Sequence, residues 1–237
     1  MKLLKILLEQ EKILVPRRIK GRAEKYELGT QKKIQQYIEN GSEGDLNLLG
    51  TPIKSLPDNL KSVGGNLYLQ GTPIKSLPDN LESVGGSLNL YDTPITSLPD
   101  NLEYIGGSLH LEASKITTLP NNLKVGGSVL LSFSAIKSLP DNFKVGKELL
   151  LMVTPLTSLP NNLKVGGTLA LAGTPIKSLP DNLEIGKSLL LQDTPITSLP
   201  DNLKVRVDLY IENSALAKKY TDEEIRNLAD IGGDIIR

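Results

Sequence analysis

The sequence predicts a mostly β solenoid, in which coils of 20 to 21 residues stack on one another. The first observation is a nearly constant phrase, Leu56-Pro57-Asp58-Asn59-Leu60 in its first copy, which occurs eight times at intervals of 21 and later 20 residues. The second is a short aliphatic alternation, such as Leu67-Tyr68-Leu69, which precedes each copy and occurs a ninth time at Leu209-Tyr210-Ile211. A fixed period of this length is typical of stacked repeats, so we expect about nine short parallel strands.

The residues of one coil indicate how the chain turns back on itself. In Leu67-Tyr68-Leu69 the two leucines point to one side of a short strand and the tyrosine to the other. Thr72-Pro73 ends the strand, because proline has no backbone N–H for a ladder. Ile74 and Leu77 then return to the interior. The pair Gly85-Gly86 indicates an unusual φ or a close approach of two backbones.

Both ends of a solenoid expose apolar core unless a cap covers them. We therefore divide the chain into an N-terminal helical segment and cap over residues 1–43, the solenoid over 44–213, and a C-terminal helical cap over 214–237. Thr30 is the predicted N-cap of a capping helix that runs to about Asn40. The apolar stripe of this helix is formed by Ile34, Tyr37 and Ile38.

Other features of the two ends are also readable. Met1–Val15 is rich in Leu and Ile and predicts a further amphipathic helix. At the C-terminus Thr221 and Glu224 have capping-box spacing, with Ile225 and Leu228 on one face of the helix that follows. The closing stretch, residues 231–235, repeats the glycine and strand phrase and predicts a last partial strand.

The repeat spacing resembles that of a known family. Leu67-x-Leu69-x-x-Thr72-x-Ile74-x-x-Leu77 is similar to the leucine-rich repeat, and the short period with Leu-Pro resembles the LPX-type subclass of bacterial secreted effectors. The resemblance covers about residues 44–213 and implies a solenoid of parallel strands. The family's Asn after the strand is Thr or Ser here. A weaker resemblance to uncharacterised repeat proteins of phages and environmental genomes implies no activity.

Composition excludes several functions. The 27 basic and 27 acidic residues balance, which argues against nucleic-acid binding along the whole chain. We interpret the local basic run, residues 17–25, as a solvated linker. Without Cys the chain has neither a disulfide, nor a thiolate metal site, nor the catalytic Cys of the ubiquitin ligase domain that some LPX effectors carry. His110, the only histidine, has no partner set for a metal or for catalysis, so we expect no catalytic residue, cofactor or metal.

Variation between coils is concentrated at the outward positions of the strands. The central row of these positions is Asn47, Tyr68, Asn89, His110, Leu130, Leu150, Ala170, Leu190 and Tyr210. The second row is Leu49, Gln70, Tyr91, Glu112, Ser132, Met152, Ala172, Gln192 and Glu212. We expect the partner-binding residues to be Tyr68, Tyr91, His110, Leu130, Leu150, Met152, Leu190 and Tyr210.

The sequence is compatible with two functions. The first is a non-catalytic scaffold that binds a protein partner with the outward strand face. The second is a structural or assembly protein, for example a virion-associated one, that forms a homo-oligomer through the apolar face or the N-terminal helix. It stays open whether the face is exposed or covered, for example by Met1–Val15.

Location follows from the apolar segments. No stretch approaches about 18 apolar residues, so we expect no membrane span. The N-terminus lacks a convincing cleavage site, which favours a cytoplasmic protein and leaves export by a dedicated secretion system open.

Overall fold

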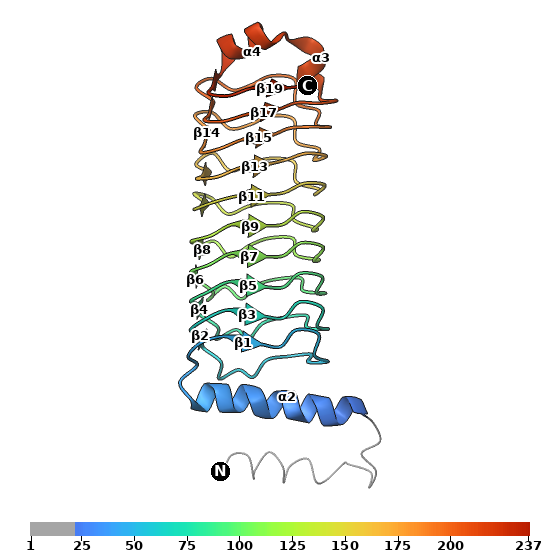
Figure 1. The fold of residues 1–237 in the computed structure, drawn as a ribbon, viewed down its shortest axis with the longest axis vertical. Helices are drawn as coiled ribbons and strands as arrows, with labels where there is room; N and C mark the ends of the chain where they lie inside the picture. The colour runs from blue at the N-terminus through green and yellow to red at the C-terminus, as the bar shows by residue number, and fades with distance from the viewer. Residues whose placement is uncertain (1–21) are drawn as a thin grey trace.

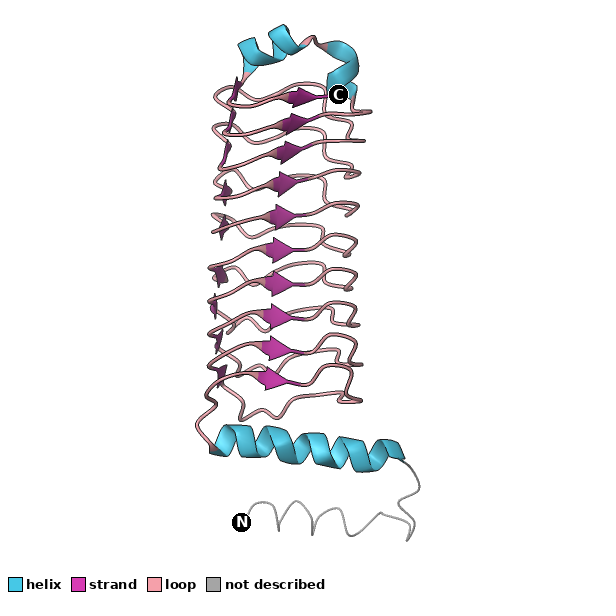
Figure 2. Cartoon of the chain, in the orientation of Figure 1, coloured by secondary structure: helices cyan, strands magenta, loops and turns pink. Residues whose placement is uncertain are grey.

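The chain forms a single stack of coils in the computed structural model, which describes residues 22–237 (Figures 1 and 2). Each coil contributes one strand to each of two parallel sheets. The first sheet has ten strands: β1 (Leu46–Asn47), β3 (Leu67–Tyr68), β5 (Leu88–Asn89), β7 (Leu109–His110), β9 (Val129–Leu130), β11 (Leu149–Leu150), β13 (Leu169–Ala170), β15 (Leu189–Leu190), β17 (Leu209–Tyr210) and β19 (Ile235–Ile236).

The second sheet was not expected from the sequence. Its nine strands are β2 (Ser62–Val63), β4 (Ser83–Val84), β6 (Tyr104–Ile105), β8 (Lys124–Val125), β10 (Lys144–Val145), β12 (Lys164–Val165), β14 (Glu184–Ile185), β16 (Lys204–Val205) and β18 (Asp230–Ile231). The prediction of about nine parallel strands therefore described one side of the stack. First-sheet strands lie within a Leu-x-Leu alternation, whereas each second-sheet strand has a single buried residue, such as Val63, and so no alternation marks it in the sequence.

Backbone hydrogen bonds join each coil to both of its neighbours. In the first sheet the Leu67 N–H donates to the Ser87 carbonyl of the next coil at 2.9 Å. In the second sheet the Gly85 N–H donates to the Val63 carbonyl of the preceding coil at 2.8 Å. Ten strands spaced about 4.8 Å apart make the first sheet about 43 Å long.

Close contact between coils explains the glycine pairs. A Cβ atom on Gly85 would overlap the carbonyl oxygen of Gly64 in the coil below, and one on Gly106 would overlap the carbonyl oxygen of Gly85. Neither Gly85 nor Gly86 has a positive φ. Close backbone approach, and not an unusual φ, therefore accounts for Gly85 and Gly86.

The interior is one continuous aliphatic core. In a representative coil Leu67, Leu69, Ile74, Leu81 and Val84 are each fully buried. The hydroxyl that replaces the family's Asn points inward, as Thr72 does by donating from Oγ1 to the Leu69 carbonyl at 2.7 Å. This bond satisfies a strand-end carbonyl inside the corner of the coil, where water is excluded.

Helix α2 (Arg22–Glu39) covers the first coil (Figure 1). Ile34 is buried and Tyr37 and Ile38 pack against the core, as the stripe predicted. The predicted start was wrong, because Thr30 lies inside the helix, which begins at Arg22. Favourable propensity in the preceding Arg, Ala, Glu and Lys residues extends the helix past a residue that could have capped it.

The last coil is covered by α3 (Ala215–Lys219) and α4 (Asp222–Leu228). The capping box of Thr221 and Glu224 is present, and Ile225 is fully buried. Leu228 is 40% exposed, so it is not part of a buried face with Ile225. Strand β19 confirms the predicted partial strand. The divisions at residues 43 and 213 stay a prediction. Of the basic run interpreted as a linker, Arg22 and Lys25 lie in α2 instead. The rest of that run and Met1–Val15 lie outside the described residues.

Candidate functional site

The outward positions of the first sheet form one surface, here called the strand face. Its central row is in register, with Leu130 opposite Leu150, Leu150 opposite Ala170, and Ala170 opposite Leu190. The three leucines are partly exposed, whereas the smaller Ala170 is buried between them. The strand register therefore brings these predicted residues together in four neighbouring coils.

The remaining predicted residues extend this surface in both directions. Met152 is partly exposed in the second row beside Leu150. Tyr68 and Tyr210 are partly exposed near the two ends of the central row, and Tyr91 is 51% exposed in the second row. The predicted residues thus form an apolar centre with an aromatic and polar region on either side.

His110 lies between the apolar centre and the early coils. Its Nδ1 is 3.7 Å from Glu112 Oε1, and the pair stands on adjacent outward positions of one coil. No group of three His, Asp or Glu residues among residues 22–237 is placed to hold a metal ion. Within residues 22–237, His110 and Glu112 form a polar pair on the strand face.

A third row borders the strand face, and sequence reasoning missed it. These residues follow the second row and all have a left-handed backbone, with φ between 52° and 69°. The row is Gly50, Gly71, Asp92, Ala113, Phe133, Val153, Gly173, Asp193 and Asn213. Left-handed φ favours Gly, Asn and Asp, and it costs other residues roughly 1–2 kcal/mol. Three consecutive coils have such a strained residue, namely Ala113, Phe133 and Val153.

Phe133 and Val153 are also the most exposed large apolar residues of the central coils. Phe133 is 63% exposed and Val153 is 55% exposed, next to Leu130, Leu150 and Met152. One signal could have found them in the sequence. They stand one residue before the inward Ser or Thr of their coils, where six of the nine coils have Gly, Asp or Asn.

A polar margin closes the strand face on the side where the strands begin. The Glu148 carboxylate accepts from Ser128 Oγ at 2.5 Å and from Lys187 Nζ at 3.1 Å. Lys187 reaches across a whole coil, because Gly167 in the intervening coil has no side chain. The hydrogen bond from Ser128, and next the one from Lys187, lower the pKa of Glu148. The carboxylate is therefore ionised at neutral pH, and it links three coils within a run of four.

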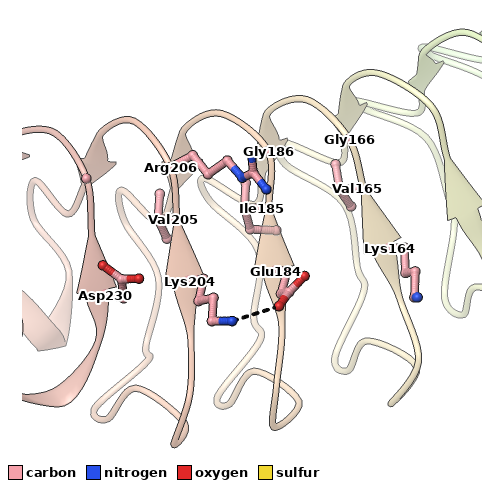
Figure 3. A pocket seen from close by; sticks show the side chains of 11 residues that line it. Lys164, Val165, Gly166, Glu184, Ile185, Gly186, Lys204, Val205, Arg206 and Asp230 are labelled. Atoms are coloured by element: carbon pink, nitrogen blue, oxygen red, sulfur yellow. Dashed lines mark hydrogen bonds and ion pairs between the residues drawn. The ribbon is translucent and has the colours of Figure 1, made fainter.

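The second sheet carries an open groove with a different chemistry (Figure 3). Lys164, Glu184, Lys204, Arg206 and Asp230 line it, beside the row of glycines. Lys204 Nζ donates to Glu184 Oε1 at 3.0 Å, and this bond lowers the pKa of Glu184. The groove has charges of both signs, and all five charged residues are exposed to solvent. Exposed ion pairs contribute little binding energy, so this groove does not indicate a specific site.

Parallel strands, coils of about 20 residues and the recurring Leu-x-Leu core define the protein as a solenoid with the leucine-rich-repeat fold. It is similar to YopM, a leucine-rich effector protein from Yersinia pestis, with a TM-score of 0.55 and 16% identity over 84% of this chain. The chain spans 62% of the YopM chain. The predicted fold is confirmed.

Two further structures are similar to this chain. A leucine-rich-repeat domain of a Shigella effector matches with a TM-score of 0.49 and 19% identity, over 98% of this chain and 97% of that one. A leucine-rich-repeat protein of Leptospira interrogans matches with a TM-score of 0.46 and 19% identity, over 77% and 58%. Neither a protein-family profile nor a curated sequence matches the chain.

Proposed function

We propose that the protein is a non-catalytic scaffold that binds a partner protein with its strand face. The apolar centre of that face carries the proposal. Leu130, Leu150, Leu190 and Met152 are partly exposed in neighbouring coils, and Phe133 and Val153 stand exposed beside them. An exposed, contiguous apolar patch on a folded domain marks an interaction site.

The arrangement of the caps supports an accessible face. The helices of residues 22–237 lie at the two ends of the stack, and none of them lies over the first sheet (Figure 2). Within this part of the chain no helix has the length and apolarity that a membrane span needs. No helix of residues 22–237 therefore blocks the access of solvent or a partner to the apolar centre.

The test uses two variants of the full chain with the same new residue. Leu150→Glu puts a charge in the apolar centre, whereas Tyr104→Glu puts one at a 49% exposed position of the second sheet. Candidate partners are the proteins that the wild type and Tyr104→Glu capture from the source cells and that Leu150→Glu does not. The binding of each purified candidate to the three proteins is then measured by titration. A captured set that is the same for all three proteins contradicts the proposal.

Light scattering on the same samples separates the two competing functions. A monomeric wild type with a folded, monomeric Leu150→Glu variant favours the scaffold. An oligomeric wild type that becomes a folded monomer in Leu150→Glu favours an assembly protein instead. Circular dichroism checks the fold of each variant.

A further inference from the structure

In the third row, Phe133 and Val153 hold a strained left-handed backbone at positions where glycine would be unstrained. The N–H of Phe133 donates to the Met152 carbonyl at 2.9 Å, and the N–H of Val153 donates to the Ala172 carbonyl at 2.9 Å. Gly173 makes the equivalent bond at 2.9 Å in the next coil. Glycine thus supports the same ladder without strain, and the fold does not require a phenyl ring or an isopropyl group here.

Strained residues persist where another requirement selects them, and they are concentrated at functional sites. At Phe133 and Val153 the strain yields two apolar side chains that point into solvent on adjacent coils. They widen the apolar centre from two rows to three where Leu130, Leu150 and Met152 are also accessible. We infer that these side chains are selected for contact with a partner.

Charge around this centre indicates which partner fits. The three outward rows contain four carboxylates and neither Lys nor Arg, although the whole chain has equal numbers of both signs. Asp92 and Glu112 lie in coils before the apolar centre, Asp193 lies in its last coil beside Leu190, and Glu212 lies in the coil after it. From Glu112 to Glu212 the sheet advances five strands, about 24 Å. An apolar centre is therefore bounded by negative charge at both ends of the stack direction.

The strand pairing indicates the conformation of the partner segment. Strands β9, β11, β13 and β15 are each paired on both sides. An extended peptide laid over these coils finds no free sheet edge and leaves its own N–H and C=O groups without ladder partners. A helix satisfies those groups internally, and about 16 helical residues span 24 Å.

We propose that the strand face binds an amphipathic helical segment of a partner protein, with an apolar stripe that contacts Phe133 and Val153 and with Lys or Arg at both ends. This inference rests on the proposed function and adds the chemistry of the partner. The cations face Asp92 and Glu112 at one end and the acids of the last coils at the other. Complementary charge at the rim orients such a helix, and the apolar centre supplies most of the affinity.

The experiment uses the full-length chain and two labelled synthetic peptides of about 16 residues. Both peptides place leucines along one helical face; one has two lysines at each end, and the other has glutamates instead. Fluorescence anisotropy is expected to give at least tenfold tighter binding for the lysine peptide. Raising the salt concentration should reduce that preference, because Asp92 and Asp193 are exposed to solvent.

Matched variants locate the binding. The double variant Phe133→Gly, Val153→Gly removes both side chains from positions where glycine is relaxed, so it should fold and lose at least tenfold in affinity for the lysine peptide. Tyr104→Ser removes an exposed aromatic ring from the second sheet and should bind like the wild type.

The inference would be overturned by equal binding of the two peptides, by unchanged binding of the folded double variant, or by a full-length oligomer that the double variant converts to a monomer. The last result would identify a second copy of this chain as the occupant. If neither peptide binds while Leu150→Glu still loses its captured partner, the scaffold function stands and the helical, basic partner is wrong.

Discussion

The only two phenylalanines of the chain allow a direct measurement of what the strand face contributes to stability. Phe133 is 63% exposed, and Phe143 is 2% exposed and packs in the core. Full burial of such a side chain is worth about 1.5–3 kcal/mol, so the covered third of Phe133 is worth about 0.5–1 kcal/mol. Phe133→Ala should therefore cost about 0.5–1 kcal/mol, against about 3–5 kcal/mol for Phe143→Ala.

Phe133→Gly adds an independent check. Glycine relieves the left-handed strain, which stabilises the folded state by roughly 1–2 kcal/mol. Glycine also gives the unfolded chain more conformational freedom, which lowers stability by about 0.5–1 kcal/mol. Together with the lost burial, the free energy of unfolding should stay within about 1 kcal/mol of the wild type.

Urea unfolding followed by circular dichroism measures all three variants, with the wild type as reference. If Phe133→Ala is as destabilising as Phe143→Ala, the ring of Phe133 is a structural element. The ring would then be retained for the fold and not for a partner.

Three further outcomes follow from contacts in the coils. Gly106→Ala should lower the free energy of unfolding by about 3 kcal/mol or more, because the new Cβ overlaps the Gly85 carbonyl oxygen and forces the coils apart. Thr174→Val should cost about 1–3 kcal/mol in urea unfolding, because the buried hydroxyl donates to the Leu171 carbonyl at 2.6 Å. Glu148→Gln should be less stable than the wild type at pH 7, and the difference should disappear as the pH falls through the lowered pKa of Glu148.

Each outcome has a result that contradicts it. A Gly106→Ala protein with wild-type stability would mean that the coils tolerate wider spacing. Thr174→Ser keeps the donor, and a loss equal to that of Thr174→Val would assign the effect to packing. For Glu148 the sign follows from its lowered pKa, which adds stability above the ordinary value near 4.5. A difference that persists unchanged at pH 3 would contradict the role of the ionised carboxylate.

How much of the site could be predicted depends on the kind of residue. Leu130, Leu150 and Leu190 were identifiable, because strand alternation separates inward from outward positions once the period is known. Phe133 and Val153 were harder to identify, because exposure at a corner depends on a backbone φ that strand alternation does not report. The sequence indicates the left-handed φ at this position only through the Asn, Asp and Gly residues of other coils.

The sequence by itself determined the solenoid, its period, its aliphatic core and the outward rows, because each coil repeats the same local choices of strand, turn and glycine. Tertiary structure alone decided the second sheet and the arrangement of the strand face. These features arise when coils stack, since two-residue strands pair only with the neighbouring coil and a charge such as Glu148 meets Lys187 only across the coil between them.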